Sequence, residues 1–377
     1  MSERGRHREG VDPYAFLASG EAWDEFCDAL KERGKDLLRD TAPKSPVDVA
    51  EGHRYLAQMV RSAFELILEA GDPARPWLFT SLHETMKIGW DNPDNIHTNA
   101  RLSAEHTYRL SGTRGDAHIM SIAIYGGSYA SGGGSTENFV YMDELEIAPD
   151  GSFEAILSAK EHPGNWVKLT PQSKTMMIRQ TFTDRRNQVP ARLAIERIDP
   201  DRTAPPPLAP DYVVGALRRS AAYIRGTNKI FFDWSDLWKT KPNTFWESDA
   251  EAAAAQQGVP GQFYASGYWM LGDDEAIVFD IEPPECRYWA IVLSNYWGQS
   301  FDYRYHPVDV NMARAVYRAD GSARIVVAPE DPRLPGVNWL STEGHGEGVW
   351  TLRYLHADRH PLPTPSVVKR SELAKYA

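Results

Sequence analysis

The sequence predicts a mainly β protein with helical additions, in which two tandem antiparallel β-sandwich domains of jelly-roll type follow an N-terminal helical region. Three observations lead to this fold class: a long internal repeat, strand-like alternation in both copies, and helical periodicity confined to other segments. We expect the helical region over 13–95, the first sandwich over 96–198, a proline-rich linker and helical insertion over 199–261, and the second sandwich over 262–377.

The internal repeat consists of three markers that recur in the same order. An Asp-Gly-Ser turn, a Pro-Gly turn before Asn-Trp, and an arginine occur at 150–152, 163–166 and 179, and again at 320–322, 335–339 and 353. Residues 150 and 320 are 170 apart, and residues 179 and 353 are 174 apart. A period this long indicates two copies of one domain rather than a solenoid of short units.

The N-terminal region has the periodicity of helices. Ser45 is a candidate N-cap, with Pro46 at the first helical position and an acid at Asp48. Apolar residues then recur at helical spacing until Gly71. We expect an earlier helix around Trp23 to Leu37, and if 82–88 is helical, His83 and Lys87 share one face of it.

The first β copy shows alternation and turn signals. We expect strands over 101–110, 116–125 and 173–183, and a hairpin in which Asp150-Gly151 joins 144–148 to 152–157. The segment 199–210 contains five prolines and predicts a stiff, extended linker. A helix is expected over 212–224 after it, followed by a segment that is helical and irregular by turns.

The second β copy repeats the first. Residues 276–281 and 287–293 flank a Glu-Pro-Pro-Glu turn and correspond to the strands on either side of the turn in the first copy. Tyr125, which precedes a glycine-rich turn at the end of one strand, has a counterpart in Tyr296. The two copies therefore predict two sandwiches of one topology.

The composition limits which partners and which cellular location we expect. The formal net charge of −11 argues against a nucleic-acid partner, and no apolar run is long enough to span a membrane. The charged first ten residues lack the apolar core of a signal peptide, and two cysteines are too few for a disulfide framework. We expect a cytoplasmic protein whose partner is a small molecule, and the fold also allows a homo-oligomer.

The second copy resembles a known bacterial family. The stretches ECRYWAIVLSNYW at 285–297, DGSARIVVAPEDP at 320–332 and LPGVNWLSTEGHGEG at 334–348 are similar to the domain of unknown function 1214. The resemblance covers about the last hundred residues, and the first copy resembles a reduced relative of the domain of unknown function 1254. It implies a β-sandwich, jelly-roll-like fold and brings no accepted activity.

Differences between the copies indicate candidate catalytic residues, because duplicated residues tend to be those that the fold needs. The first copy has His162 before its Asn-Trp pair, whereas the second has His345 and Glu347 between glycines. Histidine suits proton transfer near neutral pH, and a neighbouring carboxylate could orient it. The alternative is that both are exposed turns whose glycines serve backbone geometry.

Several other residues are candidates for binding a substrate. Tryptophan offers a stacking face and asparagine fixes hydroxyls, although both also stabilise turns; the duplicated pairs are Asn165, Trp166, Asn338 and Trp339. Arg179 and Arg353 could bind a carboxylate or phosphate of a ligand. They could instead pair with a cross-strand acid on the solvent face, and we favour this second role. Tyr125 and His83 complete the set. His83 begins a polar stretch that runs past Trp90 to His97 and suits either a pocket lip or a helix end.

No motif for a metal or a cofactor is present, so we expect neither. His83-Glu84 lacks the second histidine of a zinc helix, and the glycine-rich run at 126–135 lacks the lysine of a phosphate-binding loop. Our main hypothesis is a cofactor-independent enzyme, of hydrolase or lyase type, acting on a small hydroxylated or aromatic metabolite between the helical and β domains. The alternatives are a carbohydrate or small-ligand binding module that uses the Trp and Asn pairs, and a jelly-roll assembly protein.

Overall fold

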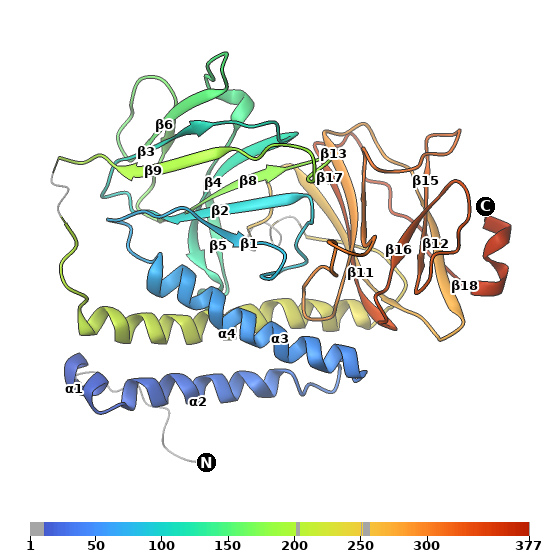
Figure 1. Ribbon diagram of the computed structural model, residues 1–377, viewed down its shortest axis with the longest axis horizontal. Helices are drawn as coiled ribbons and strands as arrows, with labels where there is room; N and C mark the ends of the chain where they lie inside the picture. Colours follow the sequence, from blue (N-terminus) through green and yellow to red (C-terminus); the bar gives the residue numbers. More distant parts are fainter. Residues whose placement is uncertain (1–10, 201–203, 250, 252–256, 377) are drawn as a thin grey trace.

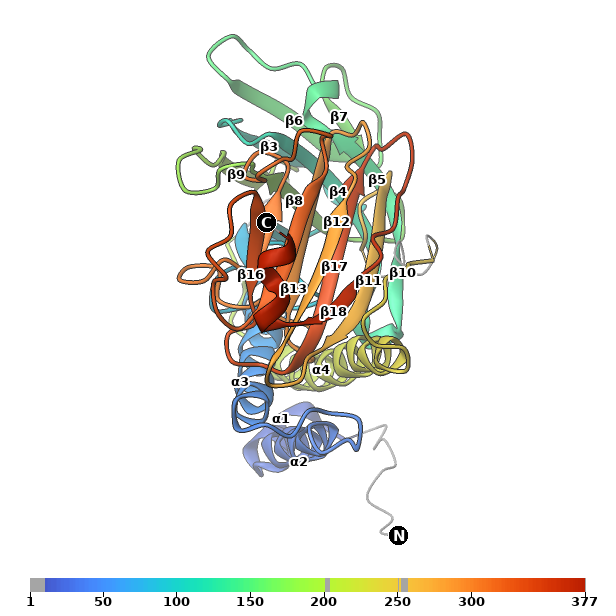
Figure 2. The ribbon, with the colours of Figure 1, turned by 90° about the vertical axis from the view of Figure 1, so that its right-hand side faces the viewer.

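The computed structural model contains two β-sandwiches side by side above a layer of helices (Figure 1). It describes residues 11–200, 204–249, 251 and 257–376. Figure 2 shows the same layering from the side, with the helices below the sheets. The mainly β fold class and the N-terminal helical region that the sequence predicts are therefore present.

The N-terminal helices begin at residues with the chemistry of helix caps. The side chain of Asp12 accepts from the first turn of α1, and Ser45 Oγ accepts from Asp48 N at 3.2 Å at the start of α3. Helix α3 packs directly on the second sandwich, because a Cβ on Gly52 would lie 2.7 Å from the ring of Trp297. The elements are α1 (Pro13–Ala18), α2 (Glu21–Asp36), α3 (Pro46–Ala63) and the π-helix η1 (Phe64–Glu69).

Helix α4 (Pro210–Lys239) runs beneath both sandwiches and is longer than the predicted 212–224 (Figure 1). The prediction stopped at residue 224, shortly before Gly226, a residue type with low helix propensity. Glycine is required there because a Cβ would lie 1.9 Å from the carbonyl oxygen of Tyr129. The chain around Tyr129 can therefore pack tightly against the middle of the helix.

The first sandwich consists of a five-stranded sheet, β1-β2-β8-β4-β5, and a four-stranded sheet, β7-β6-β3-β9. Side chains of Leu110, Ile122, Leu157 and Ile178 fill the core between these sheets. The strands are β1 (Phe79–Leu82), β2 (Asn95–Arg101), β3 (Tyr108–Thr113), β4 (Ile119–Ser128), β5 (Gly133–Tyr141), β6 (Ser152–Ser158), β7 (Trp166–Lys168), β8 (Ser173–Thr181) and β9 (Arg192–Arg197).

The second sandwich has the sheet orders β10-β11-β17-β13-β14 and β16-β15-β12-β18. Its core includes Ile277, Ile291, Ile325 and Leu352. The strands are β10 (Trp246–Glu247), β11 (Gln262–Met270), β12 (Glu275–Ile281), β13 (Tyr288–Ser294), β14 (Asp309–Asn311), β15 (Ala323–Ala328), β16 (Val337–Ser341), β17 (Glu347–Leu355) and β18 (Ser366–Lys369). A short 3₁₀ helix, η4 (Arg370–Tyr376), follows; the first sandwich carries η2 (Tyr129–Ser131) and η3 (Met142–Glu144).

The two sandwiches have the same topology, strand for strand. Adding nine to each strand number of the first sandwich reproduces both sheet orders of the second. The register agrees as well: Arg179 lies opposite His97 on β2, and Arg353 lies opposite Tyr264 on β11. His97 and Tyr264 are therefore equivalent positions, as are Asn99 and Ser266.

The predicted element boundaries differ from the structure in several places. The segment 101–110 contains the loop between β2 and β3, 144–148 is not a strand, and 82–88 contains a β-bridge between His83 and Met86 rather than a helix. Strand β1 and the start of β2 belong to the first sheet, inside the region predicted to be helical. Each four-stranded sheet also contains one parallel pair, β6 with β7 and β15 with β16, where only antiparallel pairing was expected.

The described residues contain neither a helix that could span a membrane nor a cluster that could hold a metal ion. No helix among them has the length and apolar character needed to cross a membrane. In the same part of the chain, no group of three or more His, Cys, Asp or Glu side chains is arranged to hold a metal ion.

Candidate functional site

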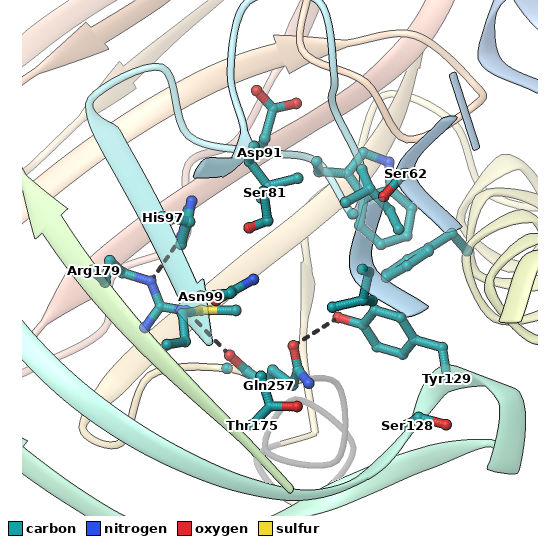
Figure 3. Close-up of a pocket in the computed structure, with 18 of the residues that line it drawn as sticks. Ser62, Ser81, Asp91, His97, Asn99, Ser128, Tyr129, Thr175, Arg179 and Gln257 are labelled. Carbon is teal, nitrogen blue, oxygen red and sulfur yellow. Dashed lines mark hydrogen bonds between the residues drawn. The ribbon is translucent and has the colours of Figure 1, made fainter. Parts of the chain in front are cut away.

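A cavity of about 400 Å³ lies between the five-stranded sheets of the two sandwiches and is flanked by helices (Figure 3). Strands β1, β2 and β8 contribute from one side, and β11 and β17 from the other. Residues of α3, η1 and α4, the loop before β2, the end of β4 with η2, and the segment 257–259 also line it. Its volume is in the range that holds a small organic molecule.

Strand alternation explains which side chains face the cavity. Successive side chains of a strand point to opposite faces of the sheet, so every second residue of β2 reaches the same space. Asn95, His97, Asn99 and Arg101 line the cavity, whereas Ala100 packs in the core of the first sandwich. On β1 the register shifts between Thr80 and Leu82, and this irregularity brings the adjacent residues Ser81 and Leu82 into the lining.

Four arginines make the cavity strongly cationic: Arg101, Arg179, Arg219 and Arg353. Among the described lining residues, Asp91 is the only carboxylate, and its two oxygens already accept from the backbone N and the hydroxyl of Ser300, each at 2.8 Å. Burial lowers the pKa of Arg353, and burial together with the charge of Arg219 lowers that of Arg101. No carboxylate in the described structure forms an ion pair with Arg179 or Arg353, so an anionic group would be stabilised there.

Arg179 and His97 form a hydrogen-bonded pair at the centre of the lining. Arg179 Nε donates to His97 Nε2 at 3.0 Å, and Arg179 Nη2 donates to the carbonyl oxygen of Gln257 at 3.3 Å (Figure 3). Burial lowers the pKa of His97 well below its ordinary value, and the charge of Arg179 lowers it further. The imidazole is therefore neutral and carries its proton on Nδ1, since Nε2 accepts.

Several buried polar atoms of this lining have no hydrogen-bond partner in the part of the chain that the structure describes. They include the donor atoms Arg179 Nη1, His97 Nδ1 and Trp90 Nε1, the hydroxyl of Ser81, and the amide oxygens of Asn95 and Asn99. Each such group costs about 1–3 kcal/mol when it is left unsatisfied. Their concentration at one cavity indicates a site for a polar ligand.

Aromatic rings form the opposite part of the wall. Trp90 stacks on Trp234 with ring centroids 5.8 Å apart and 3° between their planes, and it meets Phe231 edge-on at 5.2 Å. The backbone of Trp90 is in the left-handed region, with φ at +53°. It is held there because its N–H donates to Gly298 O at 2.8 Å and its carbonyl accepts from Arg353 Nη2.

The duplicated arginines therefore have different environments within one cavity. Arg353 binds the backbone carbonyls of Trp90 and Thr351, so its guanidinium helps to hold the aromatic wall. Arg179 keeps Nη1 without a partner among the described residues. Neither arginine lies on the solvent face beside an acid, which was the arrangement that we favoured from the sequence, because the face of each sheet that carries it is covered by the other sandwich.

The predicted catalytic residues His345 and Glu347 lie outside this cavity. His345 Nδ1 lies 2.8 Å from Asp48 Oδ1, its Nε2 lies 3.4 Å from Glu51 Oε2, and its ring stacks on Phe301 at 4.6 Å. Burial lowers the pKa of His345, but the hydrogen bond to Asp48 and the charge of Glu51 outweigh burial and raise it overall. The side chain of Glu347 is directed to Lys239 and to Tyr268 OH instead.

The structure does not bring the third predicted catalytic residue to these two. His162 lies in the loop between β6 and β7 and lines neither this cavity nor a smaller one of about 200 Å³ beside Lys87 and Glu343. None of the three residues predicted to be catalytic therefore lines either of these two cavities.

The duplicated Asn-Trp pairs bind backbone in the same way in both copies. Asn165 bonds the N–H and carbonyl of Glu146 and the carbonyl of Glu154, and Asn338 makes the equivalent bonds to Val316 and Arg324. The indole nitrogens of Trp166 and Trp339 donate to the carbonyls of Ser158 and Ala328. These four residues hold the parallel strand pairs and do not line the cavity.

The remaining predicted residues lie next to the cavity. Tyr125 OH donates to Gln257 O at 3.2 Å, the same carbonyl that Arg179 binds. His83 Nε2 lies 2.7 Å from Arg61 Nη2, and His83 is not part of the lining. The polar stretch that follows His83 does reach the cavity with Trp90, Asp91, Asn92, Asn95 and His97.

Comparison with known proteins identifies relatives but no activity. Residues 273–359 match the family described as "Protein of unknown function (DUF1214)". The crystal structure of an uncharacterized protein from Burkholderia cenocepacia is similar at 40% identity and a TM-score of 0.91, covering 95% of this chain and 99% of that one. The VPA0106 protein from Vibrio parahaemolyticus is 11% identical with a TM-score of 0.49, over 84% of this chain and 98% of that one. No curated protein matches.

Proposed function

Since this chain belongs to the same family as the Burkholderia cenocepacia protein and contains a DUF1214 region, we propose that it binds a small organic anion between its two sandwiches. The observation that carries this proposal is the excess of guanidinium groups in the cavity. Four arginines stand against a single described carboxylate, which is already hydrogen-bonded to Ser300. A carboxylate or phosphate group would supply the missing charge.

The local charge is opposite to that of the whole chain. The formal net charge is −11, so the positive cavity does not follow from a generally basic composition. Buried cations without carboxylate partners destabilise an empty protein. A site that keeps them is expected to gain their interaction energy from a ligand.

The aromatic wall supports a ligand with a flat or apolar body. Trp90, Phe231 and Trp234 offer ring faces and edges, while Met177 adds an adaptable apolar surface beside Arg179. The proposed ligand has its anionic group toward β2 and β8 and its apolar part toward α4.

A cofactor-independent hydrolase or lyase activity stays a prediction. If the protein is an enzyme that acts in this cavity, His345, Glu347 and His162 would not reach its substrate, because they do not line the cavity. Carbohydrate binding through the Asn-Trp pairs has less support, since their polar groups are bonded to backbone. An assembly role, a cytoplasmic location and the relation of the first copy to the domain of unknown function 1254 also stay predictions.

Thermal unfolding of the full chain with a panel of small molecules tests the proposal. The panel contains aromatic and aliphatic carboxylates and phosphate monoesters, each beside its neutral amide or alcohol. Binding to the folded state raises the melting temperature according to ligand concentration and affinity. We expect at least one anion to stabilise the protein and its neutral counterpart to have no effect; if no anion does so, or the neutral compounds act equally, the proposal is wrong.

A further inference from the structure

We propose that the ligand is a hydroxylated organic anion, whose acid group accepts from Arg179 and His97 while a hydroxyl donates to the amide of Asn99 or Asn95. This inference rests on the proposed function and specifies the class of ligand. It follows from the alternation of donors and acceptors along one face of β2.

The donors suit the anionic group. Arg179 Nη1 and His97 Nδ1 remain without partners after Arg179 Nε has donated to His97 Nε2. Both atoms carry hydrogen, and neither residue accepts at these positions. An ionised carboxylate or phosphate has only acceptors, so it fits these two groups.

The acceptors require a hydrogen-bond donor, which an ionised acid group does not have. The amide oxygens of Asn95 and Asn99 lack partners among the described residues, and the side chain of Asn99 is 6% exposed. An ionised acid cannot donate to them, whereas a hydroxyl can. Residues two apart on a strand are separated by about 6.6 Å, so one small molecule can reach His97 and a neighbouring asparagine together.

The second copy shows the same positions with their polar groups satisfied. Ser266, the equivalent of Asn99, donates to Thr351 Oγ1 at 3.3 Å, and Tyr264, the equivalent of His97, accepts from Val259 N at 3.2 Å. The unsatisfied groups of His97 and Asn99 therefore have no counterparts at the two equivalent positions of the second copy. Asn187, an exposed loop residue outside the cavity lining, provides a matched control for the substitution of an asparagine.

Calorimetric titration of the full chain with paired acids tests this inference. The pairs differ by one hydroxyl: mandelate and phenylacetate, 4-hydroxybenzoate and benzoate, 3-hydroxybutyrate and butyrate, and glycerol 3-phosphate and propyl phosphate. We expect the hydroxylated member of at least one pair to bind at least tenfold more tightly. Asn99→Ala, or Asn95→Ala if that amide accepts the hydroxyl, should abolish that preference while leaving the affinity of the other member unchanged, and the control Asn187→Ala should preserve it.

The outcomes separate the two proposals. If no acid of any pair binds, the proposed function itself fails. If acids bind but the two members of every pair bind equally to the wild-type protein, anion binding stands and the hydroxyl inference is overturned. The wild-type comparison needs no variant, so it holds even if Asn99→Ala does not fold.

Discussion

Arg179 Nε donates to His97 Nε2 across 3.0 Å, and this hydrogen bond determines which nitrogen of His97 carries the proton. A neutral imidazole that accepts at Nε2 must donate at Nδ1. The pair therefore presents two N–H groups to the cavity, one cationic and one neutral. The charge of this pair does not change with pH near neutrality, because Arg179 is charged and the buried His97 is neutral.

Binding of an acid should consequently be insensitive to pH between 6 and 8. Burial lowers the pKa of His97 well below its ordinary value, so the ring stays neutral throughout this range. We expect dissociation constants that agree within about twofold by calorimetry at pH 6, 7 and 8, for an acid that is fully ionised. A tenfold weakening from pH 6 to pH 8 would show instead that the site binds its ligand with an imidazolium.

The Asn-Trp pairs should affect stability and not binding. Asn338 is buried and satisfies three backbone groups, so Asn338→Ala should cost about 2–4 kcal/mol of unfolding free energy. Asn165 makes the equivalent bonds at a more exposed place, and Asn165→Ala should cost about 1 kcal/mol. Urea denaturation measures both. A loss of acid binding without a loss of stability would contradict the structural role.

The fold class could be predicted well because the internal repeat and the strand alternation are visible in the sequence itself. Even there, strand boundaries were wrong near Arg101, where β2 ends and a loop begins inside the predicted strand. Polar residues alternate along β2, and alternation of this kind ordinarily indicates a solvent-exposed face. Only the packing of a second sandwich turns that face into a cavity, and sequence spacing does not contain this contact.

Only part of the candidate site was predicted, because the contact between the two sandwiches is not visible in the sequence. Arg179 and Arg353 were candidates because they are duplicated, and both line the cavity. Divergence between copies led to His345 and His162, whereas the divergence at the cavity is His97 against Tyr264. That difference becomes visible only after the register of β2 and β11 is known.

His345 should stabilise the fold in a pH-dependent way. Its pKa is raised in the folded state because the hydrogen bond to Asp48 and the charge of Glu51 outweigh burial. Its contribution is therefore complete below the unfolded value of about 6.5 and is lost as pH rises through the folded value. His345→Gln should cost about 3 kcal/mol at pH 6 and less at pH 9. Denaturation at both pH values measures this, and an equal cost at both would contradict the ion pair.

Asp94 should destabilise the fold as pH rises from about 4 to about 6. Burial, with the charge of Asp309, raises the pKa of Asp94 to about 6, against the opposing effects of Arg314 and Tyr288. The folded state thus binds a proton that the unfolded chain releases near pH 4, so stability is lost between these values. Asp94→Asn should gain about 2–3 kcal/mol relative to wild type between pH 4 and pH 7. If the difference in unfolding free energy between the two proteins stayed constant across this range, Asp94 would not titrate in this way.

The measurement that tests anion binding at the cavity most directly is calorimetry of the best-binding acid with Arg179→Met. Arg109→Met, which changes a half-exposed strand arginine paired with Glu196 and lying outside the cavity lining, is the control. We expect Arg179→Met to weaken binding at least tenfold while its melting temperature stays within a few degrees of wild type, because an unpaired buried cation is removed. Arg109→Met should bind normally. Unchanged affinity in a folded Arg179→Met protein would contradict the account.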